Sequence, residues 1–212
     1  IRDSGFSNEE FEIRFERAQE LLYKNKLDAL LITIPSNLRY FTGIDTNFWE
    51  SPTRSWFLVV PLFGNPIAII PEIGEKLFKK TFLKDIHTWS SPNLKGDDIS
   101  PLKSLLETLP SRFGAIGAEL GKEMSIRMPA IDFNLLKDNF KFDIVDGASL
   151  IWALRSVKTL NEIKKIEKVA QIVSEVFCVL PTFISASDSE RDVAKKVTKE
   201  ILKGGVDSIC LL

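Results

Sequence analysis

The stretch Asp28-Ala29-Leu30-Leu31-Ile32-Thr33-Ile34 decides the fold class of this chain. It is a short, nearly continuous apolar run, which is typical of a strand buried on both faces in the centre of a sheet. Just before it, Ser7 and Glu10 form a capping box, and apolar residues then recur at helical spacing. An amphipathic helix over residues 8–25 therefore leads directly into a central strand.

Strands and helices alternate outward from this stretch as far as residue 146, which predicts an α/β domain. The turn Phe63-Gly64-Asn65 joins two of the strands as a hairpin, so we expect a mixed sheet rather than a purely parallel one. The further strands are predicted at 56–61, 67–70, 85–89, 114–119 and 142–145, and the further helices at 72–82, 99–109 and 128–138.

After Asp146 the alternation stops and charged helical segments follow. A long helix is predicted to begin at Thr159, a second capping box at Ser187 starts another helix, and the last residues, 206–212, are predicted to begin a strand. Two helices and one strand cannot close a core of their own. The expected organisation is one domain at 1–150 and an incomplete second domain at 151–212.

The long helix is predicted to be amphipathic, with its apolar residues on a single face and charged residues crowding the first turns of the other faces. The apolar residues are Ile163, Ile166, Ala170, Val173, Phe177 and Leu180.

The composition argues against several classes of function. The chain has 28 basic and 29 acidic residues, so nothing in its net charge points to nucleic acid or to an anionic membrane surface. No apolar run reaches the length of a membrane span, and no secretory signal opens the chain. Cys178 and Cys210 are too sparse for a disulfide framework and suit buried thiols in a reducing compartment. We therefore expect a cytoplasmic protein without nucleic-acid or membrane partners.

Candidates for catalysis or metal binding are few. His87 is the only histidine, and no nucleophile or carboxylate partner is evident from its spacing, so a partly buried structural role is the better interpretation. One histidine and two separated cysteines do not form a zinc signature. Gly114, Gly117 and Gly121 are in the wrong order for a phosphate-binding loop, which favours close backbone packing.

The most promising surface is the connection at residues 44–55, IDTNFWESPTRS. Loops often carry function, and aromatic residues and arginine mark interfaces. We therefore predict an interface or site role for Phe48, Trp49 and Arg54. The alternative is that Phe48 and Trp49 simply cover the domain core.

Three segments in this order resemble a known family. Residues 35–43 (PSNLRYFTG) place an Asn, an aromatic residue and a Thr-Gly after the first strand, and residues 116–119 (IGAE) form a late strand. Residues 154–163 (LRSVKTLNEI) place an Arg, a Lys and a Glu-Ile at a junction. The pattern is similar to the N-terminal domain of the creatinase, prolidase and aminopeptidase P family of metallopeptidase-like, or pita-bread, enzymes, over nearly the whole chain.

This resemblance implies a three-layer α/β N-terminal domain with a mixed sheet, followed by the first helices of a truncated α+β pita-bread domain. In the family, two Asp, one His and two Glu bind a pair of divalent metal ions, such as Mn, Co or Zn, that activates water. No histidine follows His87, so none of these ligands can be placed here, and we expect no catalytic residue or metal ligand in this chain. Family members are commonly homodimers, which makes Phe48, Trp49 and Arg54 candidates for substrate or dimer contact.

The simplest function implied is the dimerisation and substrate-access part of a metal-dependent hydrolase, most simply an Xaa-Pro peptidase, inactive on its own. One alternative is a non-catalytic module that binds peptides or proteins. Another is a creatinase-like amidinohydrolase, or a lyase, acting on a small osmolyte-type molecule. The sequence beyond Leu212 would discriminate between these alternatives, because the five metal ligands are either present there or missing.

Overall fold

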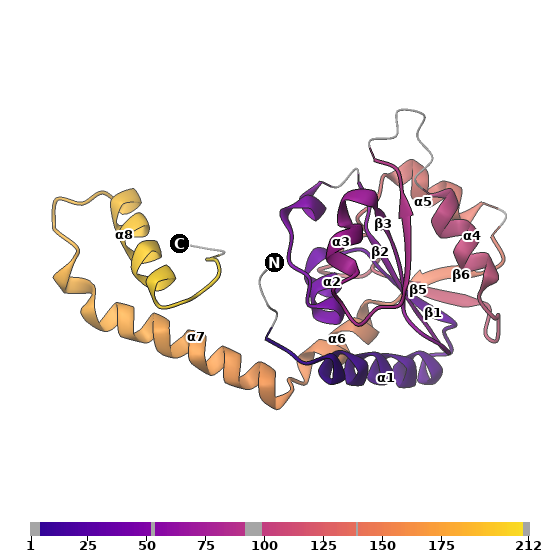
Figure 1. Cartoon of the computed structure of the whole chain (residues 1–212), viewed down its shortest axis with the longest axis horizontal. Coiled ribbons are helices and arrows are strands. Elements are labelled where there is room, and N and C mark those ends of the chain that lie inside the picture. Colours follow the sequence, from indigo (N-terminus) through magenta and orange to yellow (C-terminus); the bar gives the residue numbers. More distant parts are fainter. Residues whose placement is uncertain (1–4, 52–53, 92–98, 139, 210–212) are drawn as a thin grey trace. The chain divides into compact units, whose positions relative to one another are not determined.

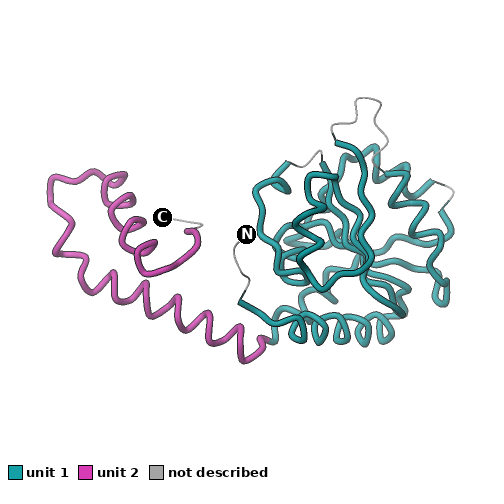
Figure 2. Tube along the Cα trace, viewed as in Figure 1, with its two compact units in different colours: residues 1–157 teal, residues 158–212 magenta. Residues whose placement is uncertain are grey.

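The computed structural model describes residues 5–51, 54–91, 99–138 and 140–209. The chain divides into two compact units, Ile1–Val157 and Lys158–Leu212 (Figure 2). The boundary predicted after residue 150 lies inside a helix of the first unit, α6 (Ala148–Ser156). Leu150, Ile151 and Leu154 of this helix belong to the core of the first unit, so α6 cannot be separated from it.

A six-stranded mixed sheet forms the centre of the first unit (Figure 1). The strand order is β4-β3-β2-β1-β5-β6. Strand β1 pairs antiparallel with β2 and parallel with β5, so Leu30 lies opposite Val60 on one side and Gly117 on the other. The predicted central position of this strand is therefore confirmed. The strands are β1 (Ala29–Ile32), β2 (Phe57–Pro61), β3 (Ile67–Pro71), β4 (Asp85–Trp89), β5 (Ala115–Ala118) and β6 (Asp143–Asp146).

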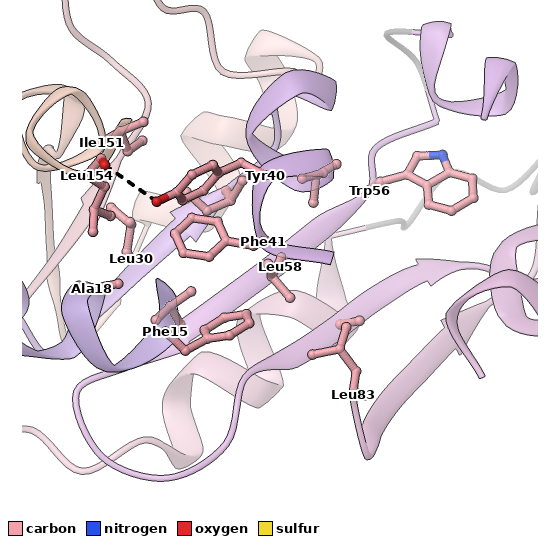
Figure 3. Packing of buried hydrophobic residues seen from close by; sticks show 14 of the residues in the cluster. Phe15, Ala18, Leu30, Tyr40, Phe41, Trp56, Leu58, Leu83, Ile151 and Leu154 are labelled. Atoms are coloured by element: carbon pink, nitrogen blue, oxygen red, sulfur yellow. Dashed lines mark hydrogen bonds between the residues drawn. The ribbon is translucent and has the colours of Figure 1, made fainter. Parts of the chain in front are cut away.

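Helices cover both faces of the sheet, as Figure 1 shows, and give the predicted three layers. Successive residues of a strand point to opposite faces, so Leu30 packs into the cluster beneath α1, α2 and α6, and Leu31 into the cluster beneath α4 and α5. Figure 3 shows the first of these clusters, where Phe15, Phe41 and Leu58 meet. The remaining helices of this unit are α1 (Asn8–Lys24), α2 (Pro35–Thr42), α3 (Glu75–Phe78), α4 (Ser100–Thr108) and α5 (Ala130–Lys137), with short 3-10 turns η1 (Asn47–Glu50) and η2 (Glu72–Gly74).

The second unit consists of α7 (Leu160–Val179), η3 (Leu180–Thr182) and α8 (Glu190–Lys203). Its buried core is small and contains Val176, Val197 and Ile201. The apolar face predicted for α7 is largely exposed, with Ile163, Ile166 and Phe177 40%, 55% and 54% exposed, and the helix buries Ile172 and Val176 instead. These two residues belong to the second half of the helix, which includes the part that packs with α8.

Three further expectations for this unit also need correction. The N-cap of α8 is Ser189, with Asp192 completing the capping box, because the chain turns at Asp188 before the helix begins. Cys178 is exposed rather than buried. Residues 206–209 form no strand, and 210–212 lie outside the described residues. No helix in the described ranges is long and apolar enough to cross a lipid bilayer.

Candidate functional site

A buried carboxyl group lies where the parallel strands β1 and β5 end at the same edge of the sheet. Glu119 follows β5, and its side chain is fully buried. Its Oε2 accepts hydrogen bonds from the backbone N–H of Thr33 at 2.6 Å and of Ile34 at 2.8 Å, and from the Thr33 hydroxyl at 2.7 Å. Its Oε1 accepts one from the Asn37 side-chain amide at 2.6 Å. Glu119 therefore joins the end of β1 to the start of α2.

Glu119 supplies the side-chain hydrogen-bond acceptor that the start of α2 lacks. The N-cap of α2 is Ile34, whose side chain cannot accept a hydrogen bond. The carboxyl group accepts from the two residues just before the helix and lies near the positive end of the helix dipole. Burial raises the pKa of Glu119, and the hydrogen bonds from Asn37, Thr33 and Ile34 offset part of that rise.

Asn37 extends this arrangement to α6. Arg155 Nη1, in the last turn of α6, donates to Asn37 Oδ1 at 2.6 Å. Because a guanidinium group has only donors, it fixes the orientation of the Asn37 amide and turns Nδ2 towards Glu119. The three residues come from the three segments that carry the family resemblance. The fold thus brings those segments together in one hydrogen-bonded chain.

Arg127 connects the same region to the connection at 44–55. Its backbone N–H donates to the Thr33 hydroxyl at 2.9 Å, and its Nη2 donates to the carbonyl oxygens of Glu50 at 2.7 Å and Trp49 at 3.2 Å. A shallow hollow of about 640 Å³ lies beside it, lined by Ile34 and residues 123–128. We name the five residues Thr33, Asn37, Glu119, Arg127 and Arg155 the carboxyl-edge cluster.

The carboxyl-edge cluster organises the backbone and does not present a reactive group. Glu119 meets donors on both oxygens and has no access to solvent, so it cannot touch a substrate. Among the residues that the structure describes, no group of three or more His, Cys, Asp or Glu could hold a metal ion. The described residues therefore do not fit the metal pair that the family resemblance implies.

The structure separates the three residues predicted as a site. Phe48 is 53% exposed and Arg54 is also exposed, whereas Trp49 is only 4% exposed. The Trp49 ring packs edge-on against Trp56 at 6.2 Å between centroids. Trp49 therefore fits the alternative role of covering the core, and a contact role for Phe48 and Arg54 stays a prediction. Residues 52–53, between them, lie outside the described residues.

The environment of His87 also differs from the expectation. It lies on the edge strand β4, and its side chain is 51% exposed rather than partly buried. Its Nε2 is 2.8 Å from Asp85 Oδ1 on the same strand. Residues two apart on a strand point to the same face, which explains this pair.

Sequence reasoning missed the carboxyl-edge cluster as a site. Asn37, Glu119 and Arg155 were included only in segments of family resemblance, and Thr33 and Arg127 were not singled out. The sequence did contain one signal for this cluster. Glu119 directly follows the small residues GAIGA of a predicted buried strand, where a charged residue is unusual. Its partners come from residues 33–37 and 155, and only the folded chain brings these together.

Comparison with known proteins agrees with this architecture. Residues 14–157 match the family described as the Creatinase/Prolidase N-terminal domain. The chain is 25% identical over 186 residues to a probable dipeptidase PepE of Mycobacterium bovis, covering 88% of this chain and 47% of that protein. It is 26% identical over 186 residues to an Xaa-Pro dipeptidase of Pyrococcus furiosus, covering 87% of this chain and 46% of that protein.

A solved structure shows the same fold. The dipeptidase PepE of Mycobacterium ulcerans aligns with a TM-score of 0.73 at 22% identity, covering 97% of this chain and 53% of that one. The chain spans about half the length of the curated relatives that it matches. The matched residues 14–157 end where the first compact unit ends. The chain thus belongs to the creatinase/prolidase N-terminal domain family.

Proposed function

We propose that the protein containing this chain is a metal-dependent hydrolase, most simply an Xaa-Pro peptidase, and that this chain supplies its dimerisation and substrate-access part. The observation that carries the proposal is the family match over residues 14–157, together with relatives named dipeptidase and Xaa-Pro dipeptidase. In this proposal, the pita-bread catalytic domain predicted for residues 151–212 starts with the second compact unit, Lys158–Leu212, because α6 packs in the first unit.

The proposal assigns the chemistry to residues outside this chain. The carboxyl-edge cluster is internally satisfied, and the described residues lack a set of metal ligands, which supports an inactive fragment. In this proposal, any cofactor is held by residues outside this chain. The sparse cysteines and near-neutral charge support a cytoplasmic location and a small peptide substrate rather than nucleic acid.

A comparison of activity tests the proposal. The present chain and the whole protein would each be incubated with dipeptides that carry proline in the second position, in the presence of Mn²⁺, Co²⁺ or Zn²⁺. We expect proline release from the whole protein only, and loss of that activity after metal chelation. Turnover by residues 1–212 alone would contradict the assignment of the chemistry to the absent part.

The same assay separates the alternatives. A whole protein that binds peptides with no turnover under any metal would support a peptide-binding module instead. Turnover of a guanidino compound such as creatine, without peptide hydrolysis, would support an amidinohydrolase.

We also propose that Phe48 and Arg54 lie at a substrate or dimer contact of the whole protein. Both side chains are exposed on a connection that Arg127 holds in place through its hydrogen bonds to the carbonyl oxygens of Trp49 and Glu50. Phe48→Ala is expected to lower turnover or weaken dimerisation in the whole protein without unfolding it. The exposed Phe63→Ala, on the β2–β3 turn, is the matched control. If Phe48→Ala and Phe63→Ala have the same turnover and dimerisation, the proposed contact role of Phe48 is contradicted.

A further inference from the structure

The last turn of α6 is held at two points by α2. The Tyr40 hydroxyl donates to the carbonyl oxygen of Leu154 at 3.4 Å, as the dashed line in Figure 3 shows. One residue later, Arg155 Nη1 donates to Asn37 Oδ1 at 2.6 Å. The first compact unit ends two residues after that, at Val157. These contacts therefore lie two to three residues before the chain leaves the first unit.

The second of these contacts has a fixed direction. Arg155 can only donate, so Asn37 Oδ1 must face it. Asn37 Nδ2 must then face an acceptor, which is Glu119 Oε1. The other oxygen of Glu119 already accepts from two backbone N–H groups and from the Thr33 hydroxyl. One orientation of the Asn37 amide satisfies both neighbours, and the reverse orientation satisfies neither.

We propose that the Asn37 amide couples the buried Glu119 to Arg155, so that the carboxyl group at the sheet edge holds the last turn of α6 in place. Asn37 and Glu119 are then positioning residues for Arg155, and through Arg155 for the exit of the chain from the first unit. Among the described residues, Asn37 is the side chain that is hydrogen-bonded to both Glu119 and Arg155. The coupling therefore has to pass through the Asn37 amide. Substitutions that change only its hydrogen bonds can distinguish this coupling from an effect of side-chain packing. The inference stands independently of any peptidase activity.

Glu119→Gln is the first test. The oxygen of the introduced amide can take the position that accepts three hydrogen bonds, but its NH₂ group then faces Asn37 Nδ2, so two donors oppose each other. If Asn37 rotates to relieve this, it presents a donor to Arg155. The variant therefore loses one buried hydrogen bond, which makes local opening of α6 easier. We expect the backbone amides of α6 to exchange about 10-fold faster. Amides of α4, on the opposite face of the sheet, serve as the internal reference in the same hydrogen-exchange experiment.

The double variant Glu119→Gln with Asn37→Asp is designed to restore the chain of hydrogen bonds. The introduced glutamine donates from its NH₂ group to one oxygen of the introduced aspartate, and the other aspartate oxygen accepts from Arg155. Every hydrogen bond is then kept, with one direction reversed, and the combined charge of the two positions is unchanged. Asn37→Asp alone sets two carboxyl groups against each other and is expected to weaken α6 as well. We expect the double variant to return α6 exchange to within about 3-fold of the starting protein.

Arg155→Ala keeps the buried pair intact, and because Arg155 is only half-buried this variant is expected to fold even where the others do not. With Arg155 removed, Asn37 can rotate without losing a partner there. Glu119→Gln raises the unfolding equilibrium constant by some factor in the starting protein, and in the Arg155→Ala background we expect that factor to be about 5- to 30-fold smaller.

Three results would overturn the proposal. The first is a double variant with α6 exchange as fast as in the worse single variant, or one that does not fold. The second is a Glu119→Gln effect that is the same with and without Arg155. The third is equal acceleration of exchange in α4 and α6 by Glu119→Gln, which would indicate a general loss of stability and not a positioning role.

Discussion

Helices α1 and α7 both begin at a side-chain cap and both carry apolar residues at helical spacing, but α1 buries most of its apolar face, whereas α7 buries only Ile172 and Val176 among its described residues. In α1, Phe15 is 5% exposed, and in α7, Phe177 is 54% exposed. The cause is the partner surface, because α1 lies against β2, α2 and α6, whereas α7 contacts α8 and η3. An amphipathic pattern therefore determines that a helix forms, and the neighbouring elements determine how much of the pattern is buried.

The largest expected effect tests this difference directly. Phe15→Ala removes a ring that packs against Phe41 and Phe82, and it should lower the free energy of unfolding by about 3–5 kcal/mol. All four tryptophans lie in the first unit, so their fluorescence in a urea titration reports its stability alone.

Phe177→Ala is the matched control, the same substitution on the exposed face of α7. We expect a change within about 0.5 kcal/mol, measured by the helical circular dichroism signal in urea. Similar losses for the two variants would show that the contrast between α1 and α7 is not one of burial.

The next effect concerns a polar group of the first unit. Asp28, at the start of β1, accepts hydrogen bonds from the backbone N–H groups of Arg112, Phe113 and Gly114, the last at 2.6 Å. Asp28→Ala leaves these donors without their partner, and we expect a loss of about 2–4 kcal/mol in the same urea titration. Asp28→Asn keeps one acceptor oxygen and should lose clearly less. If the two variants lose the same free energy of unfolding, the hydrogen bonds of Asp28 do not account for its contribution to stability.

The two units should also respond to pH with opposite sign. Burial raises the pKa of Glu119, so the folded chain binds that proton more tightly than the unfolded chain does. This contribution to stability is complete below the ordinary glutamate pKa of about 4.3 and is lost as pH rises through the folded-state value, with a slope of at most about 1.4 kcal/mol per pH unit. Urea titrations between about pH 4 and pH 7 should show this slope in the starting protein and not in Glu119→Gln.

In the second unit, hydrogen bonds lower the pKa of two carboxyl groups, chiefly one from Lys196 to the partly buried Asp188 and one from Ser189 to the exposed Asp192. Their contribution is present above the ordinary aspartate pKa of about 3.9 and is lost as pH falls through the folded-state values. Helical circular dichroism on acidification measures it. Because the Lys196 side chain is 41% exposed in this ion pair, added salt should weaken the Lys196–Asp188 part. A loss of second-unit stability on raising the pH from about 4 to about 7 would contradict this assignment.

The smallest effect should be shared by the two helices. Ser7 accepts a hydrogen bond from the Glu10 N–H at the start of α1, and Thr159 accepts one from the Glu162 N–H at the start of α7. Ser7→Ala and Thr159→Ala should each cost about 1 kcal/mol in the unit that contains them. A clearly larger loss for one variant would mean that its cap also depends on tertiary contacts.

The first unit was predictable to a large extent, because its signals are local and strong. The DALLITI stretch is a central strand, and the hairpin at Phe63-Gly64-Asn65 joins β2 and β3, as predicted. The second unit was predicted less well. Ser187 and Ser189 both have an acidic residue three positions later, so local pattern alone could not choose between two possible caps for α8.

The sequence of this chain determined its helices, its central strand and the mixed sheet, because periodicity, capping and turn chemistry act over a few residues. The family came from the resemblance of three short segments to known proteins, not from these local rules. Only the tertiary structure decided that Asn37, Glu119 and Arg155 meet, that Trp49 is buried, and that α6 belongs to the first unit. Each of these depends on contacts between residues far apart in the chain. The Glu119 carboxyl group needs donors from residues 33–37, and no local pattern specifies which distant strand will supply the acceptor.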